Sequence, residues 1–302
     1  MNNISTKNKS SHSIILFALL FLFILPKVYS EVIPDSVFSK FESELSIKAV
    51  ELSKVRFNNK LGDSLSNELS NKFEKILLME GAIAFSFDSL LAIGKVESND
   101  KNLRIFTWNT VRNDGTYLYY GFIQVYLKDK KTVKVYRLID KSDSIPNVES
   151  ASLVPENWFG ALYYDIIETN LQEGVLYTLL GWDGNDLYSN KKIIESLTFS
   201  ASGKPKFGKS VFRVGKSKQK RVIFEYSRMA NMMITYDEKN TMIVYDHLSP
   251  SNPTYQNNPA YYGPDFSYDG FKFENFVWNH LSEIDYKSTP ESLSKNKKKR
   301  RR

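Results

Sequence analysis

One short stretch of the sequence has the side-chain spacing of a calcium-binding loop. Its oxygen-bearing residues alternate and a glycine follows them, in the order Asp265, Ser267, Asp269 and Gly270. Hard oxygen ligands on alternate residues and a glycine for the sharp turn make up the first half of a helix-loop-helix calcium site. The bidentate glutamate of the second half is missing, because Phe276 stands at the twelfth position. We therefore expect either a calcium ion at Asp265, Ser267 and Asp269 or a turn in which the aspartates bond their own backbone.

Three residues are candidates for catalysis: Asp183, Asp246 and His247. A histidine beside a carboxylate is the usual pairing of a general base with the group that orients it. Asp246 adjoins His247, but neighbours on a strand point to opposite faces, which argues against a direct contact between them. Asp183 lies in a turn rich in Asp and Asn, between Gly181 and Asp186. The carboxylate oxygens of Asp183 could belong to a ligand or cation site, or the turn could simply end a strand.

No complete catalytic motif accompanies these residues. The sequence contains neither a Gly-x-Ser-x-Gly elbow nor a two-histidine zinc helix. It has no cysteine, which excludes disulfide frameworks, thiolate zinc sites, cysteine nucleophiles and a lipid anchor on an N-terminal cysteine. A hydrolase with two catalytic carboxyl groups stays open, because several acids could supply them: Asp183, Glu225, Asp246, Asp265 and Asp269.

The net charge of +7 comes from the two ends of the chain. Lys295 to Arg302 contributes seven basic residues and residues 1–30 contribute three, which leaves 31 basic against 34 acidic residues in the body. Such a body excludes a generally basic nucleic-acid-binding domain. Residues 291–302 are expected to form a disordered basic tail, which is either simply solvated or makes a weak electrostatic contact with a membrane or a polyanion.

The first thirty residues have the regions of a secretory signal peptide. Lys7 and Lys9 precede a twelve-residue apolar run from Ile14 to Leu25, and the small residue Ser30 follows. The run is shorter than the roughly 20 apolar residues that a membrane-spanning helix needs. We therefore expect cleavage after Ser30 and export to the periplasm or the extracellular space; the alternative is an anchor that is not cleaved.

Two amphipathic helices are expected in residues 31–80, packed on a sheet. Apolar residues recur at helical spacing from Val37 to Leu52 and again from Leu65 to Leu77. The segment from Leu61 to Asp63 is expected to form the turn between them, with Ser64 as the N-cap of the second helix.

From about Gly81 the apolar period changes to two, which is typical of strands. The predicted strands are Leu103 to Asn109, Thr116 to Leu127, Thr132 to Ile139, Leu162 to Glu168, Val175 to Trp182, Ser210 to Val214, Arg221 to Ser227, Asn231 to Asp237, Thr241 to Asp246 and Gly270 to Trp278. The strand around Tyr117 to Val125 barely alternates, so we expect it to be central and covered on both faces. Ser189 to Leu197 fits a short helix as well as a strand.

These patterns predict a mainly β (α+β) fold. We expect an antiparallel sheet in residues 81–290, built as a sandwich or a partly open barrel, after the N-terminal amphipathic helical pair. Eight basic residues and no acid lie between Lys204 and Arg221. They indicate a hairpin whose lysines either protect a sheet edge from unwanted pairing or recognise a polyanion or an acidic partner.

Five short motifs follow one another in the β region: Leu180-Gly181-Trp182-Asp183-Gly184-Asn185, Phe207-Gly208, Ile223-Phe224-Glu225-Tyr226-Ser227, Asp246-His247-Leu248 and Tyr262-Gly263-Pro264-Asp265. Their succession resembles an uncharacterised family of exported bacterial β-rich proteins. The resemblance implies export and a β architecture, and it implies no known reaction.

The expected function is that of a secreted or periplasmic module of the cell envelope, non-enzymatic, with a binding or structural role. Its expected partner is an envelope component or another protein, and not nucleic acid. The alternative is a carboxylate-based or divalent-cation-assisted hydrolase acting on an envelope polymer. Apart from the calcium ion considered above, no cofactor is expected.

Overall fold

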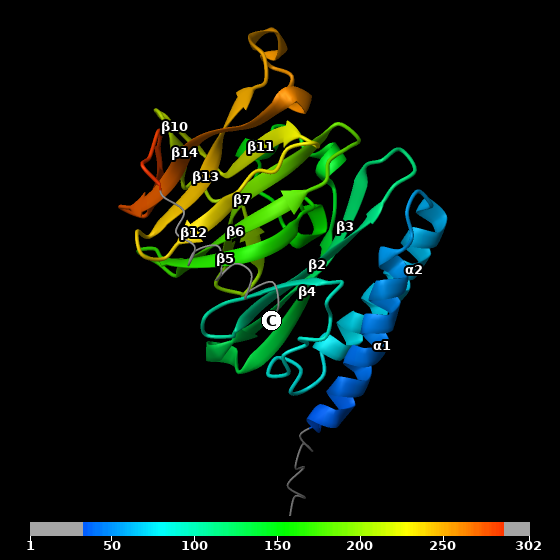
Figure 1. The fold of residues 1–302 in the computed structure, drawn as a ribbon. Helices are drawn as coiled ribbons and strands as arrows, with labels where there is room; N and C mark the ends of the chain where they lie inside the picture. Colours follow the sequence, from blue (N-terminus) through cyan, green and yellow to red (C-terminus); the bar gives the residue numbers. More distant parts are fainter. Residues whose placement is uncertain (1–32, 287–302) are drawn as a thin grey trace, which may run out of the picture. The chain divides into compact units, whose positions relative to one another are not determined.

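The computed structural model describes residues 33–286 as a helical pair followed by fifteen strands in three open sheets (Figure 1). The mainly β class and the helical pair are both confirmed. The predicted signal peptide (1–30) and basic tail (291–302) lie outside the described residues. Within the described part, no helix combines the length and apolarity needed to span a membrane.

The two helices are α1 (Asp35–Ser53) and α2 (Asn59–Leu77). The second helix begins earlier than predicted, because the side chain of Asn58 accepts a hydrogen bond from the backbone N–H of Leu61 and caps it. Ser64 as the cap is therefore wrong, and the expected turn at residues 61–63 is the first part of the helix. Gly62 is costly inside a helix, and it lies against Thr110, whose side chain an added Cβ would meet at 3.4 Å.

The first sheet lies under the helices and has the strand order β1-β2-β3-β4. Its strands are β1 (Gly94–Glu97), β2 (Leu103–Val111), β3 (Tyr117–Leu127) and β4 (Thr132–Ile139). Phe73 of α2 packs edge-on against Phe106 and Phe122 of this sheet, with ring centroids 4.9 and 5.9 Å apart. Phe122 faces the helices and the next residue, Ile123, faces the second sheet, so β3 is buried on both faces as predicted.

The second sheet has the order β11-β7-β6-β5, and β8 pairs with β7 beyond this path. Its strands are β5 (Leu162–Asn170), β6 (Val175–Asp183), β7 (Ser189–Phe199), β8 (Pro205–Phe207) and β11 (Arg221–Ser227). The alternative of a helix at Ser189 to Leu197 is wrong. Ile193 packs toward the first sheet and Ile194 packs toward the third. Adjacent side chains point to opposite faces of a strand, so both residues can be buried only if this segment is a strand.

The third sheet has the order β10-β9-β15-β14-β13-β12. Its strands are β9 (Phe212–Val214), β10 (Ser217–Gln219), β12 (Ile234–Asp237), β13 (Met242–Pro250), β14 (Tyr262–Glu274) and β15 (Val277–Leu281). The single strand predicted from Gly270 to Trp278 is wrong, because Asn275 and Phe276 both have positive φ and turn the chain. The lysine-rich hairpin forms as expected, and β10 is indeed at the sheet edge.

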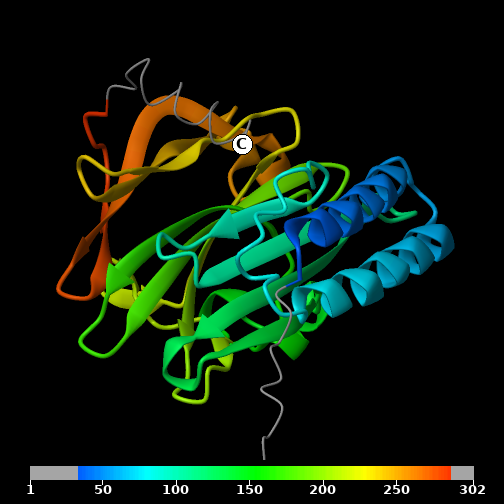
Figure 2. The same ribbon diagram turned by 90° about the horizontal axis from the view of Figure 1, so that it is seen from below.

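The layers therefore follow one another as helices, first sheet, second sheet and third sheet (Figures 1 and 2). One apolar cluster fills each of the three interfaces, and the second sheet contributes to two of them. This is sandwich-like stacking, with three sheets in place of two.

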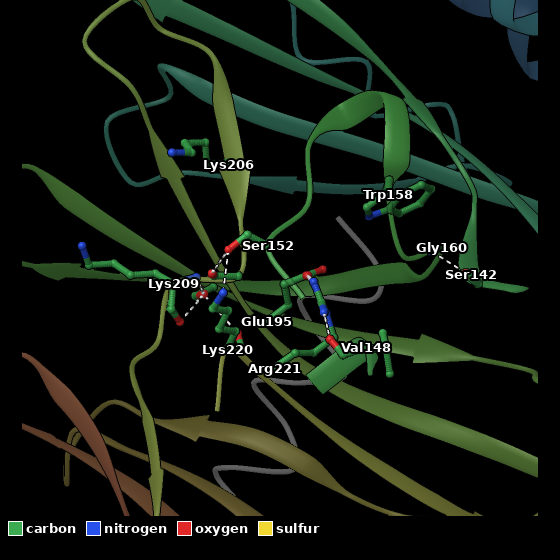
Figure 3. A network of polar contacts seen from close by, with 12 residues as sticks. Ser142, Val148, Ser152, Trp158, Gly160, Glu195, Lys206, Lys209, Lys220 and Arg221 are labelled. Carbon is green, nitrogen blue, oxygen red and sulfur yellow. Dashed lines mark hydrogen bonds and ion pairs between the residues drawn. The ribbon is translucent and has the colours of Figure 1, made fainter. Parts of the chain in front are cut away.

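A fully buried ion pair joins two neighbouring strands of the second sheet (Figure 3). Arg221 of β11 stands directly opposite Glu195 of β7, and both side chains are 0% exposed. The guanidinium of Arg221 also donates to the carbonyl of Val148, and the hydroxyl of Tyr163 donates to the second oxygen of Glu195. The indole N–H of Trp158 in turn donates to the Tyr163 oxygen at 2.9 Å. Burial, and then the negative charge of Glu195, raise the pKa of Tyr163 well above its usual range.

Removing one partner of this pair should destabilise the fold strongly. We expect Arg221→Met to lower the free energy of unfolding by about 3–5 kcal/mol, because it leaves the Glu195 carboxylate buried without its counter-charge. The double variant Arg221→Met/Glu195→Met should be more stable than Arg221→Met alone, since no buried charge remains. Urea unfolding measures both values, and the control is Arg213→Met, because Arg213 is the exposed residue of β9. This account would be contradicted if the double variant lost as much free energy of unfolding as Arg221→Met and Glu195→Met lose when added together.

Candidate functional site

A cavity of about 720 Å³ lies over β7 and β11, against residues 142–150. Its apolar lining includes Ile145, Phe159 and Ile223. Its charged lining residues are Glu149, Lys191, Lys218 and Glu225. The volume falls within the roughly 300–1,000 Å³ typical of small-molecule sites, which combine apolar walls with a few placed polar groups.

Two of these charged residues are directly opposite each other on neighbouring strands, Lys191 on β7 and Glu225 on β11. The ammonium of Lys191 donates to Asn185 Oδ1 at 2.6 Å. Glu225 Oε1 accepts from the hydroxyl of Ser189 at 2.6 Å and from Asn185 Nδ2 at 3.4 Å. The amide of Asn185 therefore stands between the two charges and holds both.

Asn185 is itself held in place by buried groups behind it. Its backbone has a left-handed φ of 48°, and its N–H donates to Asp183 Oδ1 at 2.8 Å. The hydroxyl of Tyr119 donates to the same carboxylate oxygen at 2.8 Å and accepts from the N–H of Gly184 at 2.8 Å. Burial raises the pKa of Asp183, while the hydrogen bonds from Asn185 and Tyr119 oppose that rise. Asp183, a predicted catalytic residue, is thus a buried support for Asn185 and does not line the cavity.

The predicted calcium residues lie in the third sheet, at a bulge between β13 and β14. Residues 265–267 together oppose His247 alone. Asp265 Oδ1 accepts from both the backbone N–H and the hydroxyl of Ser267, at 3.1 and 2.7 Å, which is an Asx turn. Phe266 between them has a φ of 72° and its side chain is 93% exposed. The geometry here matches the alternative stated above, a turn whose aspartate bonds its own backbone.

His247 has a carboxylate partner, which is Asp269 and not the adjacent Asp246. His247 Nδ1 lies 2.8 Å from Asp269 Oδ2, and the other Asp269 oxygen accepts from the N–H of Glu283 at 3.0 Å. His280 Nε2 lies 3.8 Å from the same Asp269 oxygen. Asp246 accepts instead from the backbone N–H of Met233 at 2.7 Å, so the argument from strand alternation is confirmed. The hydrogen bond with Asp269 raises the pKa of His247 above its usual value.

Within residues 33–286, no three His, Asp or Glu side chains are grouped in a way that could hold a metal ion. Both oxygens of Asp269 and one oxygen of Asp265 already accept hydrogen bonds. The predicted acids are thus divided among three places: Asp183 at the end of β6, Glu225 in β11, and Asp246, Asp265 and Asp269 in the third sheet. The cavity lining contains none of the three predicted catalytic or three predicted metal residues.

Comparison with protein-family models, with curated proteins and with solved structures found no match to this chain. The site therefore has to be judged on its own geometry. Sequence reasoning named Glu225 only as one of several acids, and it missed Lys191. The available signal was the motif that contains Glu225, but its pairing with Lys191 depends on the register between β7 and β11.

The pKa of His247 should depend on Asp269. In an NMR titration we expect the wild-type pKa to lie above 6.5 and to fall toward 6.5 in Asp269→Asn, which keeps an acceptor for the N–H of Glu283. Because the folded-state pKa is raised, this ion pair stabilises the protein fully below pH 6.5 and its contribution is lost as the pH rises through the folded-state pKa. The loss should stay below about 1 kcal/mol, since His247 is nearly half exposed. Asp265→Asn should shift the pKa less, and an equal shift would contradict the pairing.

Gly184 should be intolerant of any side chain. A Cβ there would lie 2.3 Å from the ring of Tyr117, which packs edge-on against Trp182 and accepts a hydrogen bond from Arg228. We expect Gly184→Ala to cost about 1–3 kcal/mol in urea unfolding, as overpacking does. The matched control is Gly263→Ala, whose Cβ would meet its nearest neighbour at an ordinary 3.5 Å. Equal losses in the two variants would show that the turn beneath Asn185 is not tightly packed.

Proposed function

We propose that this protein is an exported, non-enzymatic binding module of the cell envelope, and that it takes its ligand in the cavity over β7 and β11. The observation that carries the proposal is the pair of opposite charges, Lys191 and Glu225, fixed by Asn185 at a cavity with an apolar wall.

The arrangement suits binding because it is formed before a ligand arrives. Asn185, Ser189 and Lys191 are connected by hydrogen bonds, and Asp183 and Tyr119 support them from the interior. Side chains that are already ordered lose little conformational freedom when they bind, so more of the contact energy appears as affinity.

Hydrolysis has less support than binding. The two-carboxylate mechanism needs both groups on either side of one bond, within about 5–10 Å. Of the predicted acids, only Glu225 lines the cavity. Asp183 is enclosed behind Asn185, Asp246 is bonded to the backbone of the third sheet, and the His247–Asp269 pair lies outside the cavity lining.

Export to the periplasm or the extracellular space remains part of the proposal, on the strength of the signal-like residues 1–30. The basic residues at 291–302 would add a weak attraction to an anionic envelope surface, about 1 kcal/mol for each residue near it. The near-neutral body supports an envelope component or a protein, and not nucleic acid, as the partner.

Filling the cavity should abolish binding without unfolding the protein. We expect the wild-type protein to sediment with an insoluble envelope fraction, and Ile223→Trp, which places an indole at the cavity wall, to stay in the supernatant. The matched control is Val154→Trp, because Val154 is exposed and does not line the cavity. Circular dichroism confirms that both variants are folded. Equal sedimentation of Ile223→Trp and wild type would overturn the cavity as the binding site.

A further inference from the structure

Four charged residues line the cavity, and two of them, Lys191 and Glu225, are partly buried while Glu149 and Lys218 are exposed. Lysine and glutamate directly opposite on neighbouring strands commonly interact across the strands. In the described structure, Lys191 and Glu225 are bonded to the neutral side chains of Asn185 and Ser189 instead.

A neutral amide positions a charge but does not neutralise it. Lys191 and Glu225 are both partly buried at the cavity, where an ion interacts more strongly with a bound charge than it would in water. A ligand with one charge would satisfy one of these residues and meet repulsion from the other. A ligand with an ammonium and a carboxylate close together would satisfy both, because directly opposed strand residues are only about 5 Å apart at Cβ.

The apolar residues of the lining indicate which group would be attached to that ammonium and carboxylate. Phe159 is buried and lines the cavity, and Ile145, Val148 and Ile223 are aliphatic residues of the same lining. The cavity of about 720 Å³ leaves room for an apolar side chain beyond the charged pair.

We propose that the cavity binds the head group of an apolar α-amino acid, with its ammonium at Glu225, its carboxylate at Lys191 and its side chain against Phe159 and Ile223. This inference rests on the proposed function and names the ligand class of the same site. The head group can come from a free amino acid or from one attached to an envelope polymer with both its charges free.

Calorimetry with three related compounds tests the head group on the full mature protein. L-phenylalanine carries both charges, phenylpropionate lacks the ammonium and phenethylamine lacks the carboxylate. We expect L-phenylalanine to bind, and each of the other two to bind about tenfold more weakly or worse. Equal affinity for all three compounds would overturn the inference. It would also be overturned if L-phenylalanine did not bind and did not reduce the sedimentation of the protein with the envelope fraction.

Two variants assign the charges. Glu225→Gln keeps an acceptor for Ser189 and Lys191→Met keeps the length of the side chain, so both should fold and both should lose about tenfold or more in affinity for L-phenylalanine. Glu225→Gln should not weaken phenylpropionate, and Lys191→Met should not weaken phenethylamine. The control is Lys206→Met, an exposed lysine of β8 that does not line the cavity, and it should bind as wild type does. Unchanged binding by both site variants would overturn the assignment.

Sedimentation distinguishes the sources of the head group and separates this inference from the proposed function. If the head group is attached to the polymer, acetylating the amines of the envelope fraction should abolish sedimentation, and L-phenylalanine should compete. If sedimentation depends on an open cavity but survives both treatments, the proposed function stands and the amino-acid inference fails. If L-phenylalanine binds but the protein never sediments, the ligand is the free amino acid and the polymer contact fails.

Discussion

The buried pair of Arg221 and Glu195 is the interaction on which the cavity over β7 and β11 depends. Two ions removed from water are stable only where each has its opposite charge and its remaining hydrogen bonds, and Val148, Tyr163 and Trp158 complete that set. The pair therefore permits one register between β7 and β11. A slip of one residue would turn every side chain of β11 to the other face and break the pair. That register also places Lys191 opposite Glu225.

The second consequence of this pair is the position of residues 142–150, one wall of the cavity. The guanidinium of Arg221 holds the carbonyl of Val148, and the N–H of Lys220 donates to the carbonyl of Glu149. Residues 142–150 on one side of the cavity are thus hydrogen-bonded to β11, which forms the opposite side, and to the residue before β11. The turn that carries Asn185 is supported in the same way by Tyr119 of the first sheet. Two of the three layers of strands must be in place before the cavity has its shape.

Much of the architecture could be predicted, because strands with clear patterns leave little choice. The predicted runs at 132–139 and 221–227 match β4 and β11 at both ends. The predictions failed where contacts between distant parts of the chain decide the conformation of a segment or the partner of a side chain. The adjacent pair Ile193 and Ile194 suits a helix or a doubly buried strand, and only the third sheet resolves it. The reversal at Asn275 and Phe276 was missed because only Asn275 is a usual turn residue, while a bulky residue with positive φ is uncommon. The partners of His247 and Glu225 could not be predicted, because strand register sets both.

The third sheet is assembled out of chain order. β15 runs parallel to β9 on one side and antiparallel to β14 on the other, so it joins the β9–β10 hairpin to the rest of the sheet. Until residues 277–281 have been synthesised, that sheet consists of two pieces with unpaired edges facing each other, and the apolar surface of Phe212 lacks its neighbour Trp278. A chain growing from its N-terminus thus cannot complete its native fold early.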